Sequence, residues 1–202
     1  KYSIMASILK VDKIRGTGLD SDSFSIDGSG NITTAKTLHA PGHVVQVQYT
    51  QYTGTFSQSV TADTNTVIGA SALSVNITPT STSSIIKLET HIFHELGAEA
   101  DYANHVWFFY RDTTALKAPA AGSRPCGISI STLGYHVDIG STPEIVQYTY
   151  FDAPNTTSQI TYKIGLLPRY SRTLYVNRTV TDNDNNAHER GISFTSATEI
   201  AQ

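Results

Sequence analysis

Two histidines and a glutamate stand close together in the run His91-Ile-Phe-His94-Glu95. Imidazole and carboxylate groups serve both as zinc ligands and as general acids and bases. Along a β-strand without a bulge, however, residues three apart point to opposite faces, so His91 and His94 cannot share a metal ion. The helical His-Glu-x-x-His pattern of zinc proteases is also absent. We therefore predict no metal site here and expect His94 to be a hydrogen-bonded histidine of the core.

The run Asp182-Asn-Asp-Asn-Asn186 places oxygen donors at alternate positions, as the start of a calcium-binding loop does. The rest of that pattern fails, because Ala187 stands where such a loop has glycine and Ser193 where it has glutamate. Asp and Asn tolerate the left-handed backbone that a turn between two strands needs. We expect an exposed turn without a bound ion.

Four further carboxylates are candidates for the acid and base of a glycosidase, namely Asp138, Glu144, Asp152 and Glu199. The sequence sets no two of them at a defined spacing, and no serine stands in a nucleophile elbow. The glycine runs Gly16-Thr-Gly18 and Gly28-Ser-Gly30 lack the lysine or the following helix of a phosphate-binding loop. We expect neither an enzyme, nor any catalytic residue, nor a bound cofactor.

The composition narrows the choice of partner. The formal net charge is −3, and charged residues make up 15% of the chain, against roughly 25% in average soluble domains. No cluster of Lys and Arg supplies the basic surface that nucleic acid requires, and no run approaches the roughly 20 apolar residues of a membrane-spanning helix. Cys126 is the only cysteine, so no disulfide within the chain is expected, and we interpret Cys126 as a small buried hydrophobic residue.

The chain is rich in threonine, serine and tyrosine, and β-branched and aromatic residues favour strands. Alternating segments separated by turns predict an all-β fold, an antiparallel, jelly-roll-like β-sandwich over residues 43–202. No segment has a helical period. We expect the last two strands to pair as a closing hairpin, with Leu174, Val176 and Val180 opposite Ile192 and Phe194. Strands are expected near residues 43–50, 54–60, 64–69, 72–78, 84–96, 103–112, 127–139, 144–152, 158–167, 172–181 and 190–200.

The longest strands indicate which side chains face the core. Even-numbered residues of 84–96 are mostly apolar and odd-numbered ones carry Lys87 and Glu89, so the even set is expected inside. The even set of 160–166 points inward by the same argument. The strand near 103–112 is apolar on both faces, so it is either a central strand covered twice or a strand with one face against another subunit. Under the second alternative, the trimer-interface candidates are Phe93, Trp107 and Phe109.

Residues 1–4 precede Met5 and are interpreted as an expression remnant or an upstream start. From Met5 to about Gly42, short β segments are separated by glycines, and residues 24–26 are expected to pair with 32–34 across a glycine-rich turn. Two isolated strands bury too little apolar surface to be stable. Either other chains cover this segment, or it is a leader that orders only on a partner.

Four loops of the predicted head carry residue types that bind sugars and proteins well, since Tyr, Asn and Ser offer flat apolar area and adaptable hydrogen bonds. The loops are 97–102, 117–124, 168–172 and 182–190. The candidate receptor-binding residues on them are Tyr102, Arg169, Tyr170, Asp184 and His188. Each loop can equally be a plain connection between strands.

Short runs stand in a distinctive order along most of the chain. They are Ala6-Ser-Ile-Leu-Lys-Val-Asp12, Asp27-Gly-Ser-Gly-Asn31, Pro41-Gly-His-Val-Val-Gln46, Ile77-Thr-Pro-Thr-Ser-Thr-Ser-Ser-Ile-Ile86, Asp152-Ala-Pro-Asn-Thr-Thr157, Tyr175-Val-Asn-Arg178 and Glu199-Ile-Ala-Gln202. In these runs the chain resembles a family of small tail-fibre-like virion proteins of bacteriophages, especially marine and cyanobacterial ones.

The resemblance implies a stem or virion-attachment segment, residues 5–42, followed by a jelly-roll-like head, assembled as a homotrimer with intertwined stems. The implied role is adsorption to the host surface by avidity, through a surface glycan or an outer-membrane protein. The implied location is a phage tail or another appendage of the virion, with the N-terminal segment contacting other tail or capsid proteins. Two other roles stay open: a purely structural capsid decoration, neck or tail-hub fibre, and a polysaccharide depolymerase.

Overall fold

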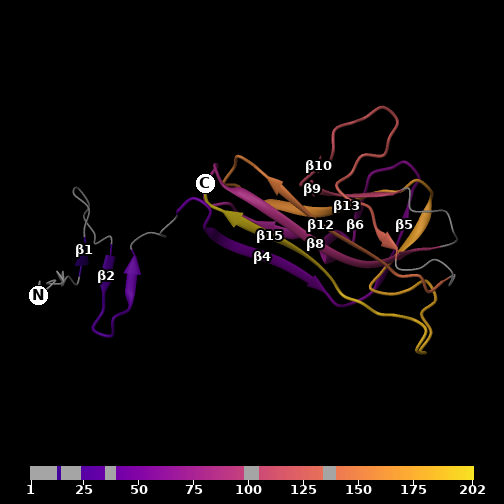
Figure 1. Cartoon of the computed structure of the whole chain (residues 1–202), viewed down its shortest axis with the longest axis horizontal. Coiled ribbons are helices and arrows are strands. Elements are labelled where there is room, and N and C mark those ends of the chain that lie inside the picture. The colour runs from indigo at the N-terminus through magenta and orange to yellow at the C-terminus, as the bar shows by residue number, and fades with distance from the viewer. Residues whose placement is uncertain (1–12, 15–23, 35–39, 98–104, 134–139) are drawn as a thin grey trace, which may run out of the picture. The chain divides into compact units, whose positions relative to one another are not determined.

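The computed structural model describes residues 13–14, 24–34, 40–97, 105–133 and 140–202 (Figure 1). The chain divides into two compact units, Lys1–Ala40 and Pro41–Gln202, and the second is called the head below. This division lies close to the boundary expected after residue 42. The expected remnant at residues 1–4 lies outside the described residues. Gly42 makes the turn into the head with a φ of 85°, which residues with a Cβ rarely adopt.

The described part of the first unit is a small antiparallel sheet in the order β1 (Lys13–Ile14), β2 (Phe24–Ile26) and β3 (Ile32–Thr34). β2 and β3 form the predicted hairpin. Asp27 closes its turn by accepting hydrogen bonds from the backbone N–H groups of Ser29 and Asn31, each at 2.9 Å. A further bond from the Asn31 side chain is the largest cause that lowers the pKa of Asp27.

The head consists of strands and, among its described residues, one short 3-10 turn at Ala70–Ala72. This agrees with the absence of a helical period in the sequence. The strands are β4 (Val44–Tyr52), β5 (Phe56–Val60), β6 (Thr66–Ile68), β7 (Val75–Ile77), β8 (Ile85–Leu96), β9 (Val106–Arg111), β10 (Thr114–Leu116), β11 (Thr132–Leu133), β12 (Glu144–Asp152), β13 (Ile160–Leu167), β14 (Arg172–Val176) and β15 (Ser193–Ile200).

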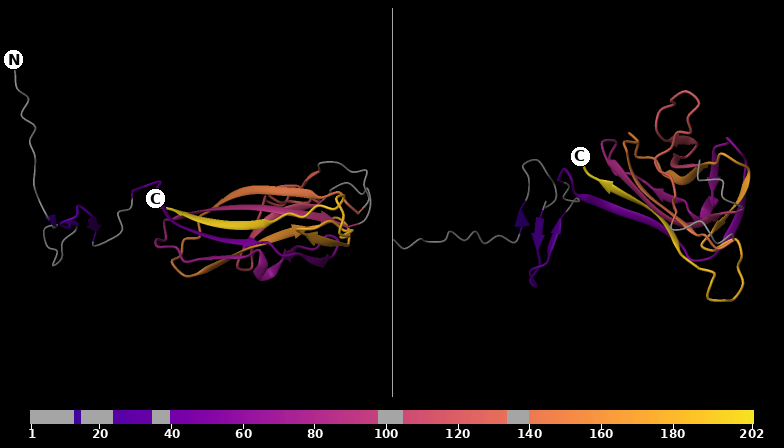
Figure 2. Two further views of the ribbon diagram at one scale, coloured as in Figure 1. Left: turned by 90° about the horizontal axis from the view of Figure 1, so that it is seen from below. Right: turned by 45° about the vertical axis from the view of Figure 1, so that its right-hand side comes forward.

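The strands form two antiparallel sheets that share one core, which confirms the predicted all-β sandwich (Figure 2). The smaller sheet has the order β10-β9-β13, with β6 and β7 both paired to the free edge of β13. The larger sheet is built around β8. One edge of β8 pairs with β12, which leads to β11, and the other edge pairs with both β15 and β14. β15 then pairs with β4, and β14 with β5.

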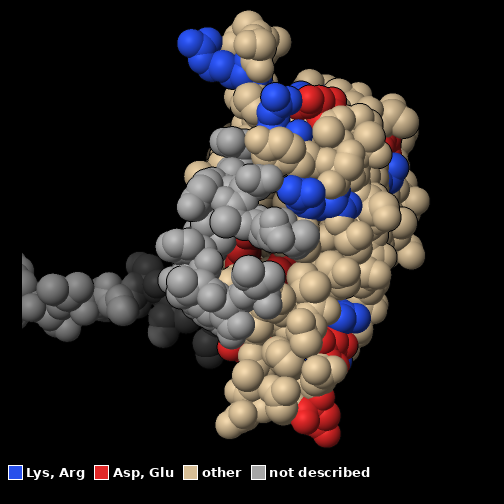
Figure 3. Space-filling view, turned by 90° about the vertical axis from the view of Figure 1, so that its right-hand side faces the viewer, with Lys and Arg blue, Asp and Glu red and all other residues tan. Residues whose placement is uncertain are grey.

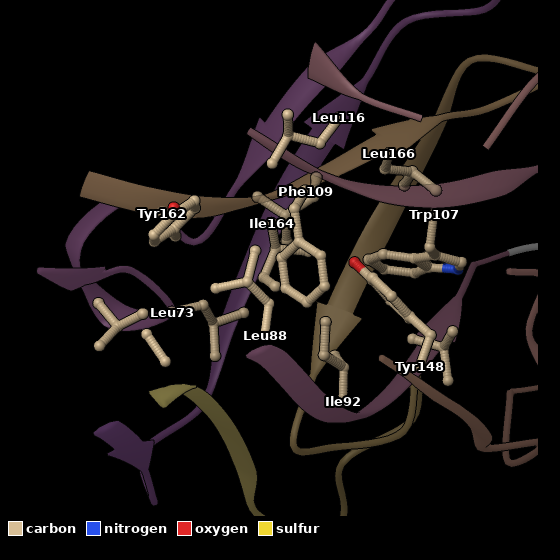
Figure 4. Close-up of a cluster of buried hydrophobic side chains, with 14 of the residues drawn as sticks. Leu73, Leu88, Ile92, Trp107, Phe109, Leu116, Tyr148, Tyr162, Ile164 and Leu166 are labelled. Atoms are coloured by element: carbon tan, nitrogen blue, oxygen red, sulfur yellow. The ribbon is translucent and has the colours of Figure 1, made fainter. Parts of the chain in front are cut away.

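The core lies between the two sheets (Figure 4). Leu88 and Ile92 of β8 and Ile164 of β13 are fully buried in it, so the inward faces predicted for residues 84–96 and 160–166 are confirmed. The rings of Phe109 and Tyr148 meet across the sheets with centroids 4.7 Å apart. Each sheet therefore contributes the face that the alternation of apolar residues indicates.

The strand that is apolar on both faces is β9, and both of its faces are covered within one chain. Phe108 points away from the shared core and is still fully buried. Gly165 lies opposite Phe108 on β13, where any Cβ would overlap the Phe108 ring. On the same face, Lys117 Nζ lies 5.1 Å from the centre of that ring. β9 is thus a central strand covered twice.

The interface expected at Trp107 and Phe109 needs correction. Both side chains are fully buried in the core of a single chain, so neither has surface left for a second subunit. Phe93 lies on the other face of β8 and is half-buried, with its ring against Gly191. Trp107 and Phe109 are core residues, which was the alternative interpretation.

The expected closing hairpin is wrong. β14 and β15 do not pair with each other. In the connection between them, one isolated β-bridge is described, between Arg178 and Arg190. Instead, both strands lie end to end along one edge of β8. Asn177, with a φ of 60°, turns the chain after β14, and its amide donates to the carbonyl groups of Tyr52 and Gly54. Alternation assigns a strand to a face but not to a neighbour.

Two smaller differences concern strands near β9. β10 follows β9 after a tight turn in which Asp112 has a φ of 52°, and the sequence pattern did not indicate it. Of the strand expected at residues 127–139, the described part contains only β11. One Asp in a possible turn position was not enough to predict that β9 ends there and that a second strand, β10, follows.

Candidate functional site

Connections between the strands gather at one end of the head, called the loop end below (Figures 1 and 2). It comprises residues 61–65, 168–171 and 177–192, with the described parts of 97–105 and 133–143. Backbone hydrogen bonds of 2.8 Å join these connections, from Asp63 to Pro168, from Gly97 to Thr173 and from Thr181 to Gly140. The head begins at its opposite end, where the Gly42 N–H donates to the Ala201 carbonyl at 2.8 Å.

Two of the predicted receptor-binding residues, Arg169 and Tyr170, lie together in the connection between β13 and β14. Arg169 Nη1 donates to both carboxylate oxygens of Asp63, at 3.0 and 2.7 Å. Tyr170 is 42% exposed, and the guanidinium carbons of Arg169 and Arg172 lie 5.9 and 5.6 Å from the centroid of its ring. The loop end therefore presents an aromatic ring with two arginines beside it.

The other predicted residues are more scattered. Asp184 is exposed, and His188 is half-buried with Nδ1 3.2 Å from the Asn183 carbonyl oxygen. Tyr102 lies outside the described residues. Asp182 pairs with Arg190, Nη2 to Oδ1, at 2.7 Å, and its segment is a connection between β14 and β15. In the described parts of the chain, no group of three His, Cys, Asp or Glu side chains is placed to hold a metal ion.

Charges of both signs are spread over the loop end, between larger uncharged areas (Figure 3). No side of the view is uniformly basic or acidic, which fits the low charge content of the chain. Within the described ranges, no helix is long and apolar enough to cross a membrane. This end therefore presents individual charged side chains rather than a broad electrostatic field.

A buried polar cluster lies beneath the loop end, where both sheets contribute residues: His94, His105, Trp107, Ser131 and Glu144. Ser131 Oγ lies 2.9 Å from His94 Nε2, 3.0 Å from His105 Nε2 and 2.9 Å from Trp107 Nε1. Ser131 also hydrogen-bonds the Glu144 side chain. One hydroxyl, with one proton and two lone pairs, thus has four polar neighbours.

Elsewhere in the cluster, two polar atoms have no described hydrogen-bond partner, Nδ1 of His94 and Oε2 of Glu144. Oε2 of Glu144 lies 3.8 Å from His94 Nε2 and 3.7 Å from His105 Nε2, beyond hydrogen-bonding distance. The hydrogen bonds are therefore concentrated on Ser131.

Burial sets the charge of this cluster. Burial lowers the pKa of His94 well below its usual 6.5, an effect that the nearby His105 adds to, and lowers the pKa of His105 to about 4. Burial raises the pKa of Glu144 to about 7, with a smaller rise from Glu95 and an opposing effect of the Ser131 hydrogen bond. Near pH 6 both histidines are neutral and Glu144 is mostly protonated.

The cluster has the residue types of a serine hydrolase but not the geometry. In a catalytic triad, the histidine contacts the serine with one nitrogen and the acid with the other. Here Ser131 and Glu144 both lie on the Nε2 side of His94 and of His105. Ser131 is also buried. We interpret the cluster as a clamp that joins the ends of β8, β9, β11 and β12 under the loops.

The carboxylates considered for a glycosidase are not all far apart, since Asp152 and Glu199 both lie opposite Ile86, on the two strands that flank β8. Glu144 and Asp152 begin and end β12, roughly 26 Å apart at the usual rise of a strand. Asp152 instead accepts hydrogen bonds from Arg111 Nη1 at 3.0 Å and from the Tyr162 hydroxyl at 2.7 Å. Glu199 is held by β4 and the link before β8. Asp138 lies outside the described residues.

Comparison of the chain with protein-family models gives no match, and comparison with curated proteins gives none. The loop end and the buried cluster are therefore interpreted from their own geometry. Sequence reasoning named Arg169 and Tyr170 as candidates, and the structure places them together, but it missed the cluster. An inward-facing His94 signalled a polar partner, but that partner could not be found, because His105 and Ser131 come from other strands.

Proposed function

We propose that this chain is a tail-fibre-like virion protein of a bacteriophage and that its head binds the host surface through the loop end. The proposal rests on one observation: the chain enters the head at one end, and the candidate loops lie at the other end. The head begins at Pro41, and the connections with Arg169, Tyr170, Asp184 and His188 lie at the other end (Figure 1). A head attached at Pro41 leaves its loops facing outward.

Binding by such a head needs no deep pocket. Three copies joined through residues 5–42, as the resemblance implies, carry three loop ends on one fibre. Linked sites of low affinity then add by effective concentration, so the particle is held although each contact is weak. Exposed aromatic and polar side chains on loops suit this task, because they supply contact area at low entropic cost.

Adsorption of the labelled full chain to intact cells of marine and cyanobacterial strains tests the proposal. We expect saturable binding to a subset of strains, weakened by Tyr170→Ala and unchanged by Phe151→Ala. Phe151 is a matched control, since it is 59% exposed and lies on β12 near the end of the head away from the loops. Periodate treatment of the cells removes binding if the receptor is a glycan, and protease treatment if it is an outer-membrane protein. The absence of binding to any strain favours the structural role instead.

We propose binding without cleavage, since Asp152, Glu199 and Glu144 each take part in hydrogen bonds with neighbouring side chains of the head. Incubation of the chain with a polysaccharide that it binds is expected to leave the size-exclusion profile of the polymer unchanged. A fall in polymer size would contradict this and support the depolymerase.

A further inference from the structure

The face of the larger sheet that points away from the core is called the sheet face below, and it is formed by β4, β15, β8 and β12 (Figure 1). Its side chains are exposed on β12 and on β4 from Val47 onward, and half-buried on β15 and on β8 as far as Phe93. A sheet face in contact with water normally carries polar residues. The sheet face instead includes Val47, Tyr49, Phe93, Ile145, Phe151 and Phe194.

These apolar side chains occur on all four strands, and several are direct neighbours across the sheet. Ile145 is 41% exposed and lies opposite Phe93. Phe194 lies opposite His91, and the two rings are stacked with centroids 6.0 Å apart and planes 13° apart. Tyr49 on β4 is 71% exposed. Uncovered apolar area that extends over a whole sheet is typical of a surface that contacts another protein.

The charges of the sheet face cancel. Lys87 and Glu89 are the one cation and the one carboxylate among its outward residues, and Lys87 Nζ lies 2.9 Å from Glu89 Oε1. A second copy of this chain presents the same neutral face, so two copies meet there without net repulsion, although each chain carries −3. A strongly charged partner such as nucleic acid would find no matching charge.

The sheet face is large enough for a specific interface. Four strands about 4.8 Å apart, with nine residues that each rise about 3.3 Å, span about 19 by 30 Å. This flat area of about 570 Å² excludes the relief of the side chains, which adds to it. A standard interface buries about 800 Å² per partner, so one sheet face supplies an area of the required size.

The sheet face also begins next to the segment that joins the copies in the proposed function. Residues 5–42 are that segment, and His43 alone separates Gly42 from β4. Copies joined through residues 5–42 therefore hold their heads at a high effective concentration. Under this condition a second copy is the partner that the sheet face meets first.

We infer that the sheet face packs against a second copy of this chain, so that the heads of one fibre contact each other directly. The inference rests on the proposed function for the joined copies. Phe93, the interface candidate that is not buried in the core, lies on this face. Val47 and Phe151 lie at its margins, on β4 and on the part of β12 beyond its pairing with β11, where loss of a side chain costs little.

Alkylation of an introduced cysteine tests whether the sheet face is covered. In the full chain with Cys126→Ser, Gln147→Cys places a thiol opposite His91, at a position that a single chain leaves exposed. We expect this thiol to react with a maleimide at least tenfold more slowly than that of Ser123→Cys, which is exposed on the loop after β10. Light scattering on the same samples is expected to show more than one chain per particle.

Two further substitutions, each combined with Gln147→Cys, separate assembly from protection within one chain. Ile145→Lys places an unpaired charge on the sheet face and is expected to restore fast alkylation. Thr113→Lys adds the same charge to the exposed turn between β9 and β10 and is expected to leave alkylation slow.

Three results would overturn the inference: a monomeric chain, fast alkylation of Gln147→Cys in an assembled chain, or slow alkylation that Ile145→Lys does not change. Fast alkylation in an assembled chain that still adsorbs to cells leaves the proposed function intact and refutes only the contact between heads. A chain that adsorbs to no cells while Gln147→Cys stays protected fails the proposed function and retains the interface.

Discussion

Glu144 is a carboxylate that keeps its proton near neutral pH. Its neighbours in the cluster are two neutral histidines and a serine with too many hydrogen-bond partners, so an ionised Glu144 would be poorly compensated. The folded protein therefore holds a proton between pH 4.5 and 7 that the unfolded chain has lost. Stability from this residue is present below pH 4.5 and is lost as the pH rises through 7.

Glu144→Gln removes this dependence, because an amide does not ionise. We expect the free energy of unfolding of the variant to rise relative to that of the wild type, by about 3 kcal/mol, as the pH increases from 4.5 to 8. Urea titrations at several pH values measure the difference. Asp184→Asn, a change at an exposed carboxylate, is the control and is expected to show no such gain. Parallel pH profiles for Glu144→Gln and the wild type would contradict the proposed protonation state.

His105 acts in the opposite direction over part of the same range. Its pKa of about 4 in the folded protein lies below the usual 6.5, so the unfolded chain binds a proton that the folded protein does not. Stability from His105 is therefore lost as the pH falls from 6.5 to 4. Burial lowers the pKa of His94 as well, so both histidines oppose the effect of Glu144 on stability in mildly acidic solution.

Glu199 fastens β15 to two other segments of the head. Its carboxylate accepts hydrogen bonds of 2.7 Å from the Gln46 side chain on β4, from the N–H and hydroxyl of Thr80, and from the Ser84 hydroxyl. Burial alone would raise the pKa of Glu199, but these hydrogen bonds outweigh it and lower the pKa. The Ser- and Thr-rich link before β8 is thus a set of donors for one carboxylate.

Glu199→Gln replaces one carboxylate oxygen with an NH2 group, which cannot accept a hydrogen bond from these donors. We expect a loss of about 1 to 3 kcal/mol in the free energy of unfolding at pH 7, since a buried donor is left without an acceptor. The difference in the free energy of unfolding between the variant and the wild type should become smaller below pH 4.5, because the wild-type carboxylate is protonated there. Glu89→Gln in the partly exposed Lys87–Glu89 pair is the control, with an expected change below about 0.5 kcal/mol. Equal losses for both variants in chemical denaturation would refute the role of Glu199.

The alternation of apolar residues predicted the faces of β8 and β13, and the pattern Asp27 to Asn31 predicted the turn of the first unit. Both depend on neighbours in the sequence. The pairing of β14 and β15, and the partners of His94, depend on residues far along the chain. An alternating pattern indicates which face of a strand a residue lies on, but not which distant residue it contacts. The buried cluster could therefore not be predicted from the sequence.

β4 forms an edge of the larger sheet, since it pairs with β15 on one side and, among the described residues, with no strand on the other. It contains no charged residue and no proline, the usual protections of an edge strand. Val47 and Tyr49 on its outer face are 52% and 71% exposed. An edge of this kind is prone to pair with other chains when the protein is heated or concentrated.

Val47→Lys places a charge on this edge. We expect it to delay aggregation on heating, as measured by light scattering, without lowering the melting temperature by more than a few degrees. Ser196→Lys adds the same charge to the same face, but on β15, which is paired on both sides. Aggregation that is delayed equally by both variants would point to net charge instead of the edge of β4.

The two strands that share one edge of β8 have a consequence for the order of folding. β15 pairs with β8 about a hundred residues after it in sequence, and the Gln46–Glu199 bond between β4 and β15 spans 153 positions. Contacts this distant in sequence close large loops, which makes folding slow. During synthesis, β4 and β8 emerge from the ribosome long before β15, so the edges that pair with β15 are unpaired until then. In the newly made chain, β4 and β8 therefore remain without their common partner strand until β15 has been synthesised.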